Sequence, residues 1–222
     1  MIEDIHFPEN LTGRQLDQYL SKGWFRMGQT IFTTDVVPLN DRLYAVHWLR
    51  INLRRLNYGR TQKKLFVLNK NFSVSIQPLN INSELEDLFA SYRNSVDFNP
   101  PQSVEEYLFL GINHNIYDSY LIQIRDHGKL IAAGIFDNGE TSIAGILNFY
   151  DPSYRKYSLG KYLMLIKAEY AIKIGKSWYY PGYIASGYSK FNYKLFPDKN
   201  ATEMYDKDSK TWLPVTLSIL IQ

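Results

Sequence analysis

Short apolar runs dominate the middle of the chain, and their spacing predicts strands. Three of them follow one another, separated only by turns of two or three residues: 119–126, 129–137 and 141–150. The runs are rich in isoleucine, leucine, phenylalanine and tyrosine, and the β-branched and aromatic members favour strands. Strands joined by turns this short pair antiparallel, so the pattern predicts a three-stranded meander.

After the meander the apolar spacing changes to that of a helix. Within residues 158–175, Leu159, Leu163 and Ile166 lie on one stripe, and Gly175 stands near the end. This spacing predicts a long helix with one apolar face. Residues 177–184 then predict a strand beside the last strand of the meander.

The other predicted elements are shorter. Thr12 and Ser103 stand where helix N-caps are expected, and Glu106 completes a capping box with Ser103. The predicted helices are 11–24, 82–96 and 103–112, and the predicted strands are 25–37, 42–53 and 72–79.

Composition excludes several kinds of chemistry. The 222 residues include no cysteine, which excludes disulfides, thiolate nucleophiles and cysteine-ligated metal centres. None of the four histidines stands at a metal-ligand spacing, so we expect no metal and no cofactor. The chain has neither an export signal at its start nor an apolar run long enough to span a membrane, and we therefore expect a cytoplasmic protein without a membrane partner.

Charge and aromatic residues are unevenly distributed. The net charge is only +3, yet no acid lies between Asp41 and Glu84, a stretch that holds eight lysines and arginines. Such a stretch attracts phosphates, unless acids from elsewhere in the fold neutralise it. The segment 179–198 is also unusual, because it combines tyrosines, phenylalanines, glycines and lysines with no acid before Asp198.

The order of meander, helix and strand resembles the N-acetyltransferase-like (GNAT) fold. The predicted fold class is α+β: a mixed, largely antiparallel sheet flanked by helices, with a β-rich N-terminal extension. In such folds the helix after the meander points its N-terminus at the acyl donor, where free N–H groups hold a phosphate or carbonyl oxygen. The turn Arg155-Lys-Tyr-Ser158-Leu-Gly160 resembles the loop that serves this purpose. We expect residues 1–77 and 78–222 as two regions packed as one unit.

Three segments together resemble the aminoacyl-tRNA–protein transferases of the arginyl and bacterial leucyl type. They are GWFRMGQTIF at 23–32, YGRTQKKLFVLNKNFSV at 58–74, and the block 149–198, which contains SLGKY and YYPGYIASGYSKFNYK. The family's usual cysteine cluster is absent, and Pro181 and Phe191 replace the usual leucine and methionine. The resemblance implies an enzyme of the N-end rule, which transfers arginine or leucine from charged tRNA to the N-terminal α-amine of a protein.

The resemblance and the two unusual stretches suggest site residues. For catalysis we expect Asp151 as an acid near the cleft, with Ser158 and Gly160 at the helix start. The residues expected to bind substrate are Arg26, Tyr180, Tyr183, Tyr193 and Lys194. The residues expected to bind tRNA are Arg60, Gln62, Lys63, Lys64 and Lys190.

Two alternatives remain open at this level. The same fold serves N-acyltransferases that use acyl-CoA, although the basic stretch would then have no explanation. A relative that binds tRNA or protein without catalysis is also compatible with the replacements at Pro181 and Phe191.

Overall fold

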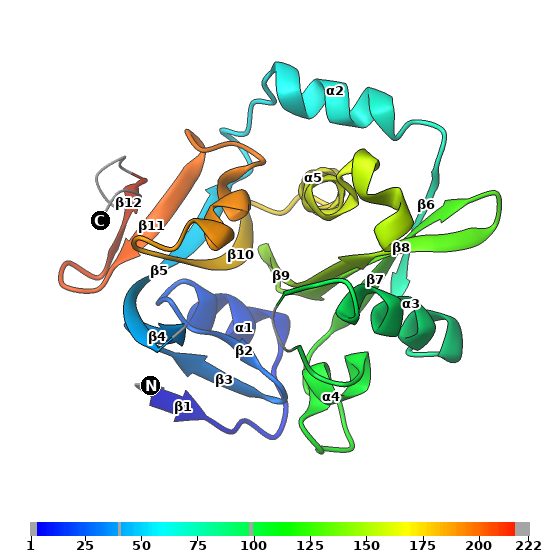
Figure 1. Ribbon diagram of the computed structural model, residues 1–222. Coiled ribbons are helices and arrows are strands. Elements are labelled where there is room, and N and C mark those ends of the chain that lie inside the picture. The colour runs from blue at the N-terminus through cyan, green and yellow to red at the C-terminus, as the bar shows by residue number, and fades with distance from the viewer. Residues whose placement is uncertain (1–3, 40, 98–99, 216–222) are drawn as a thin grey trace.

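A nine-stranded sheet runs through the protein. The structure is a computed structural model, and it describes residues 4–39, 41–97 and 100–215. The strand order of the sheet is β12-β11-β5-β10-β9-β8-β7-β6, and β4 pairs with β5 outside this path (Figure 1). The strands are β4 (Val36–Leu39), β5 (Arg42–Asn52), β6 (Ser73–Pro78), β7 (Ser119–Asp126), β8 (Lys129–Asn138), β9 (Ser142–Tyr150), β10 (Trp178–Ala185), β11 (Thr202–Asp206) and β12 (Thr211–Pro214). β10 pairs parallel to β9, and the other pairs described in this sheet are antiparallel.

A smaller sheet and the helices complete the fold. The small sheet has the order β1-β3-β2, from β1 (Asp4–His6), β2 (Phe25–Met27) and β3 (Thr30–Thr33). The helices are α1 (Gly13–Leu20), α2 (Arg60–Leu68), α3 (Ser83–Arg93), α4 (Val104–Phe109) and α5 (Leu159–Lys173), with two 3-10 helices, η1 (Pro152–Tyr157) and η2 (Ser189–Leu195). Within the described ranges, no helix is both long and apolar enough to cross a membrane.

The strands of the meander carry apolar side chains on both faces, and helices cover both faces of the sheet. In β7, Ile122 and Ile124 pack in the cluster that contains α5, whereas Leu121 packs with the residues of α3 and α4. Successive side chains of a strand point to opposite faces, so a run that is apolar throughout is buried on both. Figure 1 shows the result, with α5 and α2 on one side and α3 and α4 on the other. The predicted α+β class, meander, long helix and adjacent strand are confirmed.

The single strand predicted at 25–37 is wrong in detail. The segment forms β2, β3 and β4, because Gly28 adopts a φ of 58° between Met27 and Thr30 and turns the chain back on itself. A backbone in this region favours glycine. The short elements α2, β11, β12, η1 and η2 were not predicted from the sequence.

The pairing of β9 with β10 ends early, and this opens the sheet. The two strands pair only from Trp178 opposite Ser142 to Tyr180 opposite Ala144. Pro181 follows and has no N–H to donate, and Gly182 has a φ of 95°. β9 therefore continues to Tyr150 with no strand partner on this side among the described residues, while β10 remains paired with β5.

The sheet includes strands from both predicted regions. β5 lies between β10 and β11, and β6 pairs with β7 at the far edge. The division of the chain at residue 77 stays a prediction, and its outer limits at residues 1 and 222 lie outside the described residues.

Candidate functional site

A cavity of about 580 Å³ lies where β9 and β10 have separated, and we call it the inner cavity. Its walls come from β2, β3, β5, β9, β10, α3, α4, α5 and η2. Most of its lining is apolar or aromatic, including Phe25, Met27, Phe32, Trp48, Phe89, Leu110, Ile146, Leu147, Met164 and Tyr183. Its charged lining residues are Arg26, Lys167 and Lys194, and no Asp or Glu of the described chain lines it.

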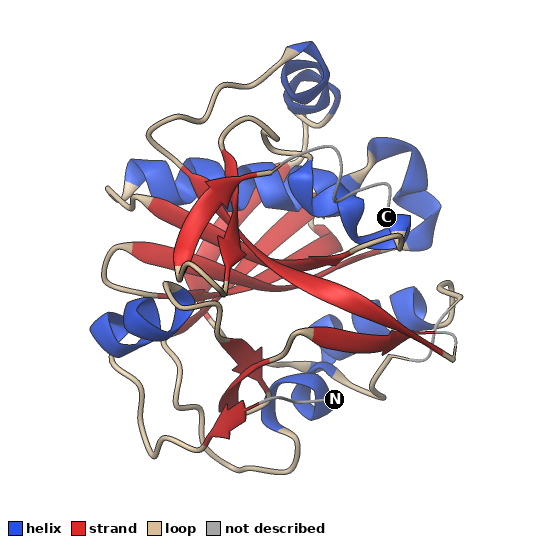
Figure 2. Ribbon diagram, turned by 90° about the vertical axis from the view of Figure 1, so that its left-hand side faces the viewer, coloured by secondary structure: helices blue, strands red, loops and turns tan. Residues whose placement is uncertain are grey.

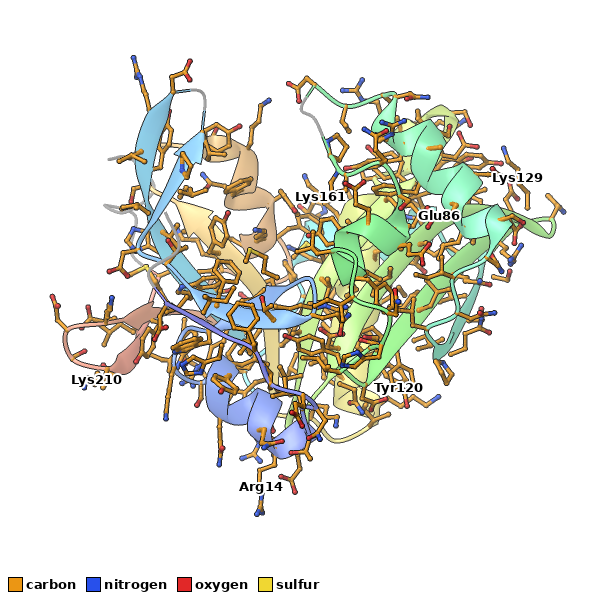
Figure 3. The ribbon with its side chains drawn as sticks, turned by 90° about the horizontal axis from the view of Figure 1, so that it is seen from below. Arg14, Glu86, Tyr120, Lys129, Lys161 and Lys210 are labelled. Carbon is orange, nitrogen blue, oxygen red and sulfur yellow. The ribbon has the colours of Figure 1, made fainter. Side chains whose placement is uncertain are left out.

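A second cavity of about 690 Å³, the outer cavity, adjoins the first at the start of α5. Tyr92, Asn148, Phe191 and Tyr193 line both cavities, so these four side chains mark their junction. The cations of the outer cavity are Arg155, Lys161 and Lys190. Figure 3 shows Lys161 between the part of the molecule that carries β5 and β10 and the part that carries α3 and α4.

Asn148, at the junction, is fixed in place by Lys167. Lys167 is 1% exposed, and its Nζ donates to the carbonyl oxygens of Ile135 and Leu147 at 2.7 and 3.2 Å and to Oδ1 of Asn148 at 2.8 Å. These three acceptors match the three donors of an ammonium group. Burial lowers the pKa of Lys167 to about 7, against the opposite effect of Asp137. Because Oδ1 of Asn148 is held in this way, its Nδ2 is available at the junction, with one long bond of 3.4 Å to the carbonyl of Gly160.

Lys194 faces the inner cavity without an acidic partner in the described chain. Its Nζ donates to the carbonyl oxygen of Tyr183 at 2.7 Å and lies 4.7 Å from the ring centroids of both Tyr183 and Phe191. Burial lowers the pKa of Lys194 to about 7. The amine thus lies among aromatic rings with two of its three possible donors unused in the described structure.

Arg26 lines the inner cavity, but its side chain is largely buried and bonded within the protein. Its side chain is 2% exposed and pairs with Asp137, with Nη1 2.8 Å from Oδ1. Nη1 also donates to Ser119, and Nε and Nη2 donate to the carbonyl oxygens of Gly28 and Leu108 at 2.7 and 2.9 Å. Four of the five donors of this guanidinium are therefore used internally, and the substrate-binding role of Arg26 stays a prediction.

The structure separates the three predicted tyrosines. Tyr183 lines the inner cavity, and Tyr193, which is 45% exposed, lines both cavities. Tyr180 instead lies in the core cluster beneath α1, with its ring 5.7 Å from that of Trp212. It is buried because it precedes Pro181 and still pairs with β9, so a substrate-binding role for Tyr180 is not retained.

Asp151 lies away from both cavities, although it directly follows β9. Its Oδ1 accepts from the backbone N–H of Ser153 at the start of η1, and its Oδ2 pairs with Lys129 at 2.7 Å. Figure 3 shows Lys129 at the outer edge of the molecule. Partial burial opposes ionisation, but the bonds from Lys129 and Ser153 outweigh it and lower the pKa of Asp151. This carboxylate caps a helix, and we do not retain it as a catalytic acid or base.

Ser158 and Gly160 are located where the sequence predicts a helix start. Ser158 adopts a φ of 51° between η1 and α5, and both residues line the outer cavity. The first N–H groups of α5 have no acceptor within the helix, and they carry the positive end of its dipole. With Arg155 and Lys161 close by, this part of the outer cavity suits a phosphate.

Part of the basic stretch forms α2, which stands apart from the sheet (top of Figures 1 and 2), whereas Arg50 and Arg55 of the same stretch pair with Glu203. Arg60, Lys63 and Lys64 are exposed on this helix. Gln62 is not: its Nε2 donates to the carbonyl oxygen of Phe196 at 2.6 Å and anchors the helix. The ring of Phe196 lies 5.1 Å from Nζ of Lys161, so α2 adjoins the outer cavity through this residue.

Lys190 is exposed and pairs with Asp97 at 2.6 Å across the outer cavity. Asn148, Lys167 and Tyr92 are not among the site residues predicted from the sequence. Lys167 was nevertheless visible as a single lysine among apolar residues on α5, from Leu163 to Ala168.

In the described ranges, no three His, Asp or Glu side chains gather as a metal site requires, and the absence of a metal or cofactor stays a prediction.

Comparison with known proteins identifies the family. The family model described as "Arginine-tRNA-protein transferase, C terminus" matches residues 84–198, which is more than half of the chain and includes β9 and β10. The chain belongs to this family of aminoacyl-tRNA–protein transferases. The transferase is 26% identical over 201 residues to an aspartate/glutamate leucyltransferase of Leptospira interrogans, covering 88% of this chain and 76% of the relative.

A second relative gives the same family. The transferase is 24% identical over 196 residues to an aspartate/glutamate leucyltransferase of Campylobacter jejuni, covering 86% of this chain and 80% of that one. Among solved structures, a GCN5-related N-acetyltransferase from Anabaena variabilis has a TM-score of 0.45 at 9% identity, covering 91% of this chain and 43% of the other. The transferase has the predicted GNAT-like order of meander, helix and parallel strand, and its family is one of aminoacyltransferases with tRNA and protein substrates.

Proposed function

We propose that the transferase moves leucine, and not arginine, from aminoacyl-tRNA to the N-terminal α-amine of an acceptor protein. The inner cavity carries this proposal, because its lining is largely apolar and includes no acid of the described chain. A guanidinium is always charged and would need a carboxylate there, whereas the protonated amines of Lys167 and Lys194 would repel it. A leucine side chain requires only apolar contact. The names of the two relatives support the same donor.

The junction between the cavities is the proposed place for the ester bond. The aminoacyl side chain would occupy the inner cavity, and the 3′ end of the tRNA would occupy the outer one. Tyr92 and Tyr193 offer aromatic faces on which a terminal adenine can stack. The start of α5, with Lys161 and Arg155, would hold the adjoining phosphate.

The chemistry is aminolysis of an ester that is already activated. The acceptor's neutral α-amine attacks the carbonyl carbon, a C–N bond forms, and the C–O bond to the tRNA breaks. The proton lost by the amine ends on the leaving 3′ oxygen. Between these events the carbonyl oxygen carries negative charge, and a hydrogen-bond donor fixed beside it lowers the barrier. We assign this role to Nδ2 of Asn148, with Lys167 as its positioning residue.

A transfer assay with matched donors tests the proposed function. One tRNA is charged in separate reactions with labelled leucine and labelled arginine, so that the two donors differ only in the amino acid. We expect label from the leucine donor to enter peptides with N-terminal Glu or Asp, and the arginine donor to give at most a few per cent of that rate. Transfer of arginine at an equal or higher rate would overturn the donor assignment. No transfer from either tRNA, together with transfer from acyl-CoA, would favour the N-acyltransferase alternative.

The exposed cations of α2 are proposed to bind the acceptor stem of the tRNA. We expect the double substitution Lys63→Ala/Lys64→Ala to weaken tRNA binding and to reduce the slope of log K against log salt by about 1 to 2. Filter binding at several salt concentrations measures both quantities. Lys22→Ala is the control, because Lys22 is exposed just after α1, and Figure 1 shows α1 well separated from α2. An unchanged slope in the double variant would place the tRNA elsewhere.

A further inference from the structure

Lys194 differs from the other charged residues of the inner cavity in that most of its hydrogen-bond donors have no acceptor among the described residues. Arg26 is neutralised by Asp137 at 2.8 Å. Lys167 gives its three donors to three oxygens. Lys194 has one acceptor, the carbonyl oxygen of Tyr183, and none of the described acids pairs with it. Its amine therefore has donors to spare, and they are located in the cavity.

The surroundings of Lys194 disfavour its charge in the absence of a ligand. Aromatic rings lie on two sides of Nζ, and the nearby Gly182 leaves its space open, since a Cβ there would stand 3.4 Å from Nζ. Burial lowers the pKa of this lysine to about 7. A cation in such a place gains most from an anionic partner, and the chain supplies none of its own in the described residues. The missing partner is best supplied by a substrate.

We propose that Lys194 selects the acceptor, by pairing its ammonium with the side-chain carboxylate of an N-terminal Asp or Glu. The inference rests on the proposed function, in which the donor's carbonyl lies at the junction of the cavities. Lys194 and the junction residues Phe191 and Tyr193 lie close together along the chain, and Lys194 and Phe191 are in contact. An acceptor whose carboxylate binds Lys194 would therefore bring its α-amine toward the ester. The names of the relatives specify acceptors of this acidic class.

Isosteric acceptor pairs test the proposal. Peptides that begin with Glu or with Gln, and otherwise have the same sequence, are compared by kcat/KM with the leucine donor. We expect the wild type to prefer Glu by about 10- to 100-fold, the range that a hydrogen bond to a charged group supplies. In Lys194→Gln the ratio is expected to fall toward one, because the amide can still donate to Tyr183 but carries no charge. Lys194→Arg retains a cation and is expected to restore part of the preference.

The controls separate failure of this proposal from failure of the proposed function. Lys173→Gln removes an exposed charge from the end of α5 and should leave the Glu-to-Gln ratio unchanged. If the Glu-to-Gln ratio of kcat/KM in Lys194→Gln equals that of the wild type, the proposed role of Lys194 is overturned. This holds also if the substitution lowers kcat/KM for both peptides by the same factor. If the wild type transfers leucine to no peptide, the proposed function itself fails. Circular dichroism of each variant shows whether it is folded, and a folded Lys194→Arg without any preference would also overturn the proposal.

The preference should also depend on pH. The ammonium form binds the carboxylate, so the Glu-to-Gln ratio is expected to be highest below pH 7 and to decline as Lys194 loses its proton above it. Taking the ratio cancels the ionisation of the acceptor's own α-amine. Lys167 titrates in the same range, so the decline must be absent in Lys194→Gln if Lys194 causes it. The other titratable or charged residues that line this cavity are Arg26, Tyr92, Tyr107, Tyr179, Tyr183 and Tyr193. The phenols among them stay protonated below pH 9. A ratio that is constant from pH 6 to 9 would contradict the proposal.

Discussion

Replacement of Asn148 by aspartate is expected to slow the transfer of leucine by about 100- to 1,000-fold, the loss found when a donor to a developing oxyanion is removed. The two side chains have the same shape, but a carboxylate has no N–H and would repel the negative oxygen. Lys167 already donates to Oδ1 at this position and would pair with the carboxylate. The fold should therefore be retained, and the loss should fall on the chemical step.

Single-turnover kinetics with saturating leucyl-tRNA measure that step directly, and filter binding measures the affinity for the same tRNA. We expect the rate constant to fall and the dissociation constant to change by less than about threefold, because the interaction is made mainly in the transition state. Asn113→Asp is a matched control on an exposed loop. A variant that binds tRNA poorly but reacts normally once saturated would show that Asn148 contributes to binding and not to catalysis.

The regular part of the fold could be predicted because its elements are defined by neighbours in the sequence. The meander is visible in its alternating apolar runs and short turns, and α5 is visible in its apolar stripe between Ser158 and Gly175. β10 follows from its place after the helix. The same reasoning could not find α2. The apolar side chains of Val67 and Leu68 on this short helix are exposed, and the helix is held by the hydrogen bond from Gln62 to Phe196, 134 residues away.

The candidate site was predicted only in part, because its geometry depends on contacts between distant segments. Tyr183, Tyr193 and Lys194 line the inner cavity as the segment 179–198 suggested, since β10 and η2 form one of its walls. Asn148, by contrast, acquires its place through Lys167 on another element and through the early end of the β9–β10 pairing at Pro181. No local sequence pattern around Asn148 predicts that arrangement.

Arg26 shows how a family motif can suggest contact with substrate at a residue whose observed hydrogen bonds serve the fold. Its partner Asp137 lies 111 residues away on β8, with Ser119 of β7 as a second donor to the same oxygen. Burial raises the pKa of Asp137, and Arg26 and Ser119 oppose that effect. Oδ2 of Asp137 has no hydrogen-bond partner among the described residues, so this carboxylate depends on Arg26 for most of its charge compensation.

Arg26→Met is therefore expected to lower the free energy of unfolding by about 3–5 kcal/mol, the cost of leaving one charge of a buried pair without its partner. Methionine fills similar space but supplies neither the charge nor the donors. Asp137→Asn in the same chain should recover part of the loss, because no buried charge then remains. Arg14→Met is the matched control: Arg14 and Glu140 form an exposed pair, and such pairs contribute at most about 1 kcal/mol.

Urea unfolding measures these differences in the free energy of unfolding, and its repetition at several pH values shows how they depend on pH. In the variant, the pKa of Asp137 should rise further in the folded state, while in the unfolded state it keeps its ordinary value near 3.8. The folded variant then holds a proton that the unfolded chain releases, so its stability relative to the wild type should fall as the pH rises from about 4 toward neutrality. A variant as stable as the wild type that has lost its affinity for leucyl-tRNA would instead show that Arg26 binds substrate, as its place in the Gly23–Gly28 motif first suggested.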